Sequence, residues 1–153
     1  MNKINYLVFL ILLLTLGCKT HEKTIKNISC SGEVILQYDR IKYSDRNKPK
    51  AHKNLETFTV YFLSEYKDSI QGYVNEKLIY ENYINQRDSD DDNNKYFNYN
   101  YSKDTKIPIL KIRLVNKLTC FDIQIDKRYK LIYVWLDRNE KWLVRFSNIY
   151  YLP

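Results

Sequence analysis

The chain has 153 residues, of which 25 are Lys or Arg and 18 are Asp or Glu, so its formal net charge at pH 7 is +7. This length suits one domain and excludes two large ones. With 15 Tyr, 6 Phe, 3 Gly and 3 Pro, the composition excludes a fully disordered chain and a collagen-like or low-complexity one.

The chain begins with a short cationic and apolar segment. Lys3 precedes an apolar run over 6–16 (YLVFLILLLTL), and Gly17 and Cys18 close it. A helix that crosses a bilayer needs about 20 apolar residues, so the run is too short for a permanent span. Its length and its cationic leader are typical of a secretory signal, whereas a buried core helix would be amphipathic or capped.

The residues Thr15-Leu16-Gly17-Cys18 resemble a lipobox, the site at which bacterial signal peptidase II cuts before a lipid-modified cysteine. The resemblance implies a bacterial lipoprotein with a signal peptide over 1–17, an acylated Cys18, a lipidated tether over 18–29 and a single domain over 30–153. Several acyl chains at about 0.8 kcal/mol per buried CH₂ would make attachment to the lipid membrane permanent. Because Lys19 and not Asp follows Cys18, we expect a cell-envelope location at the outer membrane, on its periplasmic or its surface face.

Cys30 and Cys120 are the two cysteines that remain once Cys18 is lipidated. In an exported protein, an even number of remaining cysteines indicates a disulfide. The alternative is a pair of small buried apolar side chains that never meet.

From residue 33 onward, apolar and polar residues alternate, with turn signals about every ten residues. This pattern is typical of half-buried antiparallel strands, and no stretch after residue 20 has a helical period with caps. About eight or nine strands predict an all-β fold, an antiparallel β-sandwich of immunoglobulin-like type, with an open barrel as the alternative. Tyr129 stands where the tyrosine corner of such sandwiches would fall, although an ordinary strand-edge tyrosine explains it as well.

Few residues suggest catalysis. The only histidines are His21, in the tether, and His52, in the loop 46–54. The chain has no Gly-rich phosphate loop, nucleophile elbow, H-E-x-x-H or C-x-x-C motif. We therefore predict a protein that is not an enzyme and needs no cofactor. A hydrolase or a Ca²⁺-dependent module is kept as a third hypothesis.

The segment 87–94 (RDSDDDNN) is a dense run of oxygen donors between two predicted strands. Ca²⁺ takes about six to eight oxygen ligands, so the run is a candidate calcium site. It lacks the Gly and the Glu of an EF-hand, and a solvated loop is the preferred interpretation. The candidate ligands are Asp88, Asp90, Asp91 and Asp92.

The loop 46–54 (RNKPKAHKN) concentrates positive charge. An exported lipoprotein does not meet nucleic acid, so the candidate partners are anionic headgroups, lipopolysaccharide or an acidic protein. The alternative is that these lysines serve solubility. The cations concerned are Arg46, Lys48, Lys50 and Lys53.

The segments 130–137 and 141–147 form a predicted hairpin whose register decides the role of Trp135. If the connection has an even number of residues, Trp135 lies opposite Trp142 and both side chains belong to the core, which is the preferred interpretation. If it is odd, Tyr133 and Trp135 project outward beside Arg145 and can stack sugars or anchor a partner. A second aromatic stretch has the same ambiguity and comprises Tyr96, Phe97, Tyr99 and Tyr101.

The leading hypothesis is a membrane-anchored, non-enzymatic lipoprotein that binds an envelope protein or glycan. The alternative is a periplasmic immunity or inhibitor lipoprotein that neutralises a toxin or a lytic enzyme. The lipid signal, the all-β body and the charged loops fit both.

Overall fold

The computed structural model describes residues 21–26, 30, 32–40, 49–52, 56–63, 66–85, 95–102 and 106–151, with the backbone alone over 21–26. These residues form ten strands and no helix, so the described part of the chain contains no helical membrane span. The strands are β1 (His21–Lys26), β2 (Glu33–Tyr38), β3 (Thr57–Phe62), β4 (Asp68–Val74), β5 (Lys77–Ile84), β6 (Tyr96–Asn100), β7 (Ile109–Leu114), β8 (Thr119–Gln124), β9 (Leu131–Leu136) and β10 (Trp142–Ser147).

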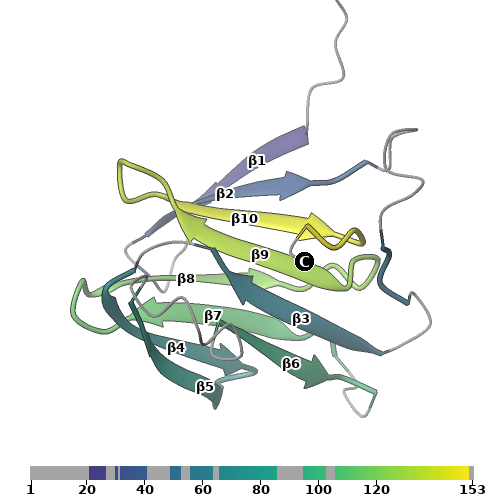
Figure 1. Cartoon of the computed structure of the whole chain (residues 1–153), viewed down its shortest axis with the longest axis horizontal. Helices are drawn as coiled ribbons and strands as arrows, with labels where there is room; N and C mark the ends of the chain where they lie inside the picture. The colour runs from purple at the N-terminus through teal and green to yellow at the C-terminus, as the bar shows by residue number, and fades with distance from the viewer. Residues whose placement is uncertain are drawn as a thin grey trace, which may run out of the picture.

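The strands build two sheets that pack against each other (Figure 1). The six-stranded sheet has the order β1-β2-β10-β9-β3-β6, and the four-stranded sheet has the order β5-β4-β7-β8. Most neighbours are antiparallel, but β10 runs parallel to β2 and β9 runs parallel to β3. The predicted all-β sandwich is confirmed, whereas its immunoglobulin-like subtype stays a prediction.

The structure has one strand that was not predicted, β1, and it lies in the segment that was expected to be the tether. It pairs antiparallel with β2, from His21 opposite Tyr38 to Lys26 opposite Glu33, and forms one edge of the six-stranded sheet. The segment is polar and lacks alternation, so its sequence carried no signal for a strand.

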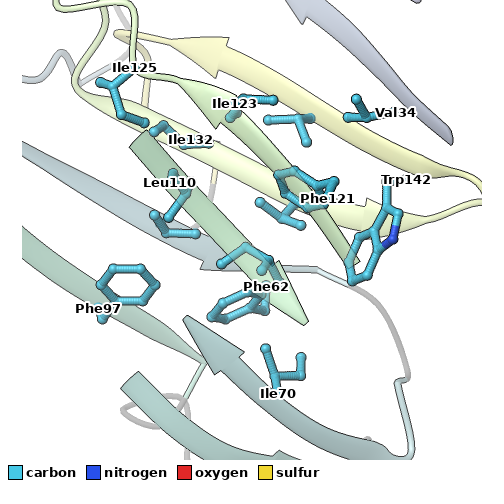
Figure 2. Close-up of a cluster of buried hydrophobic side chains, with 14 of the residues drawn as sticks. Val34, Phe62, Ile70, Phe97, Leu110, Phe121, Ile123, Ile125, Ile132 and Trp142 are labelled. Atoms are coloured by element: carbon cyan, nitrogen blue, oxygen red, sulfur yellow. The ribbon is translucent and has the colours of Figure 1, made fainter. Parts of the chain in front are cut away.

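The alternation of apolar residues determines which face of each strand is buried. Val34, Val60, Ile112 and Val144 are fully buried, and their chain neighbours point to the opposite faces of the sheets. Figure 2 shows the resulting core, where Phe121 of β8 lies beside Trp142 of β10. Each large apolar side chain buried in this way stabilises the fold by about 1.5–3 kcal/mol.

Two local features set the geometry of the four-stranded sheet. Asn75 and Glu76 join β4 to β5 in a tight turn, and both have a positive φ, at 49° and 66°, as hairpin turns of type I′ require. The buried carboxylate of Asp68 accepts hydrogen bonds from the backbone N–H groups of Asn116 and Lys117, both at 2.9 Å. Asp68 therefore fastens the β7–β8 turn to the start of β4.

Tyr129 does not form a tyrosine corner. Its hydroxyl donates to the carbonyl oxygen of Asp39 at 3.5 Å, 90 positions away, whereas a tyrosine corner bonds a few residues upstream. Its ring packs near Tyr38 and Phe146. The alternative interpretation, a tyrosine at the edge of a strand, describes it.

Candidate binding surface

A disulfide joins Cys30, just before β2, to Cys120 in β8. It links the six-stranded sheet to the four-stranded sheet. Beside it, the backbone N–H of Gly32 donates to the carbonyl oxygen of Cys120 at 3.1 Å. A Cβ atom on Gly32 would lie 2.6 Å from that oxygen and 2.7 Å from the ring of Trp142, so this approach requires glycine.

The β9–β10 hairpin has the register that leaves Trp135 outside the core. Trp142 lies opposite Leu136, and Leu143 lies opposite Trp135. The connection is therefore odd, and the preferred core interpretation is wrong for Trp135, although Trp142 is fully buried as expected. Trp135 and Arg145 share the outer face of the six-stranded sheet, the face turned away from the core.

The guanidinium group of Arg145 lies between two aromatic rings. Its Cζ is 5.3 Å from the ring centroid of Trp135 and 6.0 Å from that of Tyr151. Its Nε and Nη2 both donate to Oε1 of Gln37, at 3.1 and 2.9 Å. The hydroxyl of Tyr151 donates to Oδ2 of Asp39 at 2.6 Å, which holds the second ring in place. The odd-register alternative, which was not the preferred interpretation, placed Trp135 beside Arg145 as the structure does, but it did not include Tyr151.

Tyr133 faces the same side but is only 1% exposed, so it is not the exposed contact residue that the odd register suggested. Its hydroxyl donates to the carbonyl oxygen of Ile149 at 3.0 Å and accepts from the backbone N–H of Tyr151 at 3.1 Å. Burial raises the pKa of Tyr133 to about 12. The segment over 149–151 covers Tyr133 and is itself anchored by it.

A row of aromatic rings crosses the outer face of the six-stranded sheet. Ring centroids are 5.5 Å apart for Tyr96 and Tyr61, 5.3 Å for Tyr61 and Tyr133, and 5.6 Å for Tyr133 and Tyr151. Burial, followed by the nearby Tyr150 and Tyr96, raises the pKa of Tyr61. We call this row, extended through the Arg145 guanidinium to Trp135, the aromatic belt: Tyr96, Tyr61, Tyr133, Tyr151, Arg145 and Trp135.

The second aromatic stretch covers β6 and the residue after it, and its side chains lie on both faces of the sheet. Tyr96 lies opposite Tyr61 and joins the aromatic belt, whereas Phe97 and Tyr101 are buried in the core and Tyr99 packs against it. The sequence signal for the aromatic belt was therefore available. The outward-facing positions of β3, β6 and β9 carry tyrosines, although short polar side chains would be enough to keep this face soluble.

One cation of the basic loop, Lys50, lies in the described residues, beside the C-terminal segment. Lys50 pairs with Ile149, and the backbone N–H of Tyr150 donates to the carbonyl oxygen of Pro49 at 3.0 Å, so the segment over 49–51 lies along the C-terminal segment. The other loop cations lie outside the described residues: Arg46, Lys48 and Lys53.

The remaining candidate sites also lie outside the described residues. These are the lipidation site Cys18 and the candidate calcium ligands Asp88, Asp90, Asp91 and Asp92. Within the described part of the chain, no group of three or more His, Cys, Asp or Glu side chains is placed to hold a metal ion.

The aromatic belt has features of a binding surface: around the buried Tyr133, the side chains of Tyr61, Tyr96 and Trp135 are half-buried and that of Tyr151 is exposed, and the Arg145 cation lies near two of the rings. Tyrosine, tryptophan and arginine are the residue types that dominate protein interfaces. Comparisons of the chain with protein families, with curated proteins and with solved structures found no match.

Proposed function

We propose that this protein is a lipid-anchored, non-enzymatic component of the bacterial cell envelope that binds an envelope protein or glycan through the aromatic belt. The observation that carries the binding role is the stacked arrangement of Trp135, Arg145 and Tyr151. Apolar ring faces with a polar rim suit both the C–H faces of sugars and the side chains of a protein partner. The anchoring role is supported by the lipobox-like residues that end in Cys18.

The rigidity of the aromatic belt supports this role. Gln37 and Asp39 of the β2 side fix the guanidinium and the Tyr151 hydroxyl, while Tyr133 fixes the backbone of Tyr151. A surface whose side chains are already ordered loses less conformational entropy when a partner binds. The aromatic belt is thus organised before binding.

The binding role is tested with the full chain as bait against envelope extracts and on a glycan array. Trp135→Ala and Arg145→Gln should each reduce saturable binding at least tenfold, since central aromatic and arginine contacts contribute about 2 kcal/mol or more. Tyr83→Ala is the matched control, because it removes a 55% exposed aromatic side chain from β5 in the other sheet. Equal binding by all three variants would refute the aromatic belt as the binding surface.

The anchoring role is tested separately. Radiolabelled palmitate should mark the wild-type chain and not Cys18→Ser, and the variant should leave the membrane fraction. Palmitate labelling that persists in Cys18→Ser, or an unchanged fractionation, would refute lipidation at Cys18 without bearing on the aromatic belt. If the captured partner is a toxin or a lytic enzyme whose activity this protein blocks, the partner class is that of an immunity protein.

A further inference from the structure

A cleft of about 560 Å³ opens on the outer face of the four-stranded sheet, on the opposite side of the sandwich from the aromatic belt. Its lining includes Lys111 and Arg113 of β7 and Tyr73 of β4. The disulfide between Cys30 and Cys120 and the side chain of Leu118 complete the apolar part of its wall. The cleft therefore combines two cations and one carboxylate, that of Glu76, with apolar surface.

The two cations lie on one face of a single strand. Lys111 and Arg113 are two positions apart in β7 and alternate with Leu110, Ile112 and Leu114, which are fully buried. Alternate residues of a strand lie about 6.6 Å apart and point to the same side. The cleft therefore presents two positive charges at the repeat distance of an extended chain.

The two cations differ in their neighbours: Asp122 of β8 lies opposite Lys111, whereas Gln71 and Cys120 lie opposite Arg113. The natural partner of Arg113 would be the side chain of Gln71, its cross-strand neighbour. The amide of Gln71 instead donates to Glu81 and accepts from the hydroxyl of Tyr73, both at 2.8 Å. By contrast, Lys117, Arg128, Lys141 and Arg145 each lie beside a carboxylate.

An apolar contact point lies beyond Arg113 in the same direction. Leu118 stands at the β7–β8 turn with a φ of 52° and is 72% exposed, the largest exposure among the large apolar side chains of the described residues. A β-turn position with left-handed backbone is usually filled by Gly, Asn or Asp, because a branched side chain costs about 1 kcal/mol there. An exposed leucine at this position offers an apolar surface to a ligand at the end of the cleft.

We propose that this cleft binds an extended acidic segment of a partner protein. Two carboxylates at alternate positions of that segment meet Lys111 and Arg113, and an apolar side chain two positions further lies against Leu118. The match rests on charge and on spacing, since an extended peptide also places alternate side chains about 6.6 Å apart on one side. The guanidinium of Arg113 can form a two-point hydrogen bond with one carboxylate.

A peptide fits this cleft better than a polyanionic surface does. Glu76 lines the cleft, and Glu81 and Asp122 stand at outward positions of the same sheet. These carboxylates would repel a uniformly anionic membrane or nucleic acid more than a short ligand with two carboxylates, which meets only Glu76 and Asp122 beside the two cations. The inference is independent of the aromatic belt, which lies on the other sheet.

The test uses the detergent-purified full chain and a fluorescein-labelled heptapeptide, SETETLS, followed by fluorescence anisotropy. We expect saturable binding that weakens with added salt, and binding of the amide peptide SQTQTLS that is at least tenfold weaker. Arg113→Gln should weaken binding of SETETLS about tenfold and Lys111→Gln a few-fold. Arg113→Lys should restore binding only in part, because an ammonium group cannot form the two-point contact.

Arg138→Gln is the matched control, since Arg138 is an exposed arginine in the β9–β10 turn and its loss changes the net charge equally. It should leave the affinity within twofold, and thermal unfolding should show that all variants are folded. The proposal is overturned if SETETLS shows no saturable binding up to about 1 mM, if SQTQTLS binds equally well, or if Arg113→Gln has no effect. It is also overturned if phosphatidylglycerol vesicles or polyphosphate bind through Arg113 and the peptide does not.

Discussion

Tyr133 shows how one side chain can serve both the fold and a surface. Its ring lies in the aromatic belt, yet its hydroxyl has the carbonyl oxygen of Ile149 and the N–H of Tyr151 as partners. Because both partners belong to the C-terminal segment, Tyr133 positions Tyr151 against Arg145. A residue that sequence alone proposed as a ligand contact therefore acts by positioning its neighbours.

Tyr133→Phe should reduce stability at neutral pH by about 1 kcal/mol, because it removes the hydroxyl that accepts from the Tyr151 N–H, whereas the Ile149 carbonyl oxygen keeps the Ser147 hydroxyl as a donor. Urea unfolding measures this loss, and hydrogen exchange should rise at Tyr151. Tyr83→Phe, at an exposed position, is the control and should change neither quantity. An unchanged exchange rate at Tyr151 would contradict the positioning role.

The same residue predicts a pH dependence. Burial raises the pKa of Tyr133 from 10.0 to about 12, so the native state keeps a proton that the unfolded chain releases. Its contribution to stability is complete below pH 10 and is lost as the pH rises from 10 to 12. Wild type should therefore lose about 1–2 kcal/mol more than Tyr133→Phe between pH 9 and pH 11. Equal losses of stability with pH in wild type and Tyr133→Phe would contradict this.

Burial also raises the pKa of Tyr38 and Tyr80. Both tyrosines are present in wild type and in Tyr133→Phe, so the comparison of the two proteins cancels their contributions.

At the scale of elements, the sequence predicted which face of each strand is buried better than it predicted which strands pair. The alternation in 58–62 and 110–114 reports burial directly, because successive side chains point to opposite faces. The parity of the β9–β10 connection depends on backbone turn geometry, in which Glu140 has a φ of 61°. Nothing in residue type indicated that parity, so the sequence left the face of Trp135 open.

The Cys30–Cys120 disulfide cross-links the two sheets and closes a separation of 90 positions. Cys30→Ala/Cys120→Ala should reduce the free energy of unfolding by about 4–5 kcal/mol, because the unfolded chain regains the entropy of an open loop. Denaturant unfolding measures the loss. Reductant should destabilise the wild type by a similar amount and leave the double variant unchanged. A loss below about 1 kcal/mol would show that packing alone holds the sheets together.

At the scale of the whole molecule, the sequence indicated the sandwich but not the order of its strands. The parallel contacts of β2 with β10 and of β3 with β9 join segments far apart in the chain. They are selected by the packing of the complete core, and no local pattern encodes them. The gathering of Tyr61, Trp135 and Tyr151 on one face follows from this order, which is why only part of the aromatic belt was foreseen.

The two proposed surfaces lie on opposite sheets with the apolar core between them, so they should act independently. Sites this far apart, with no shared partner, usually combine additively within about 0.5 kcal/mol. Trp135→Ala should therefore leave the affinity for SETETLS within twofold, and Arg113→Gln should leave capture of the envelope partner unchanged. The double variant should show both losses at their single-variant sizes. A coupling clearly above that limit, measured by the same anisotropy titrations, would mean that one ligand contacts both sheets or that the sandwich transmits a change between them.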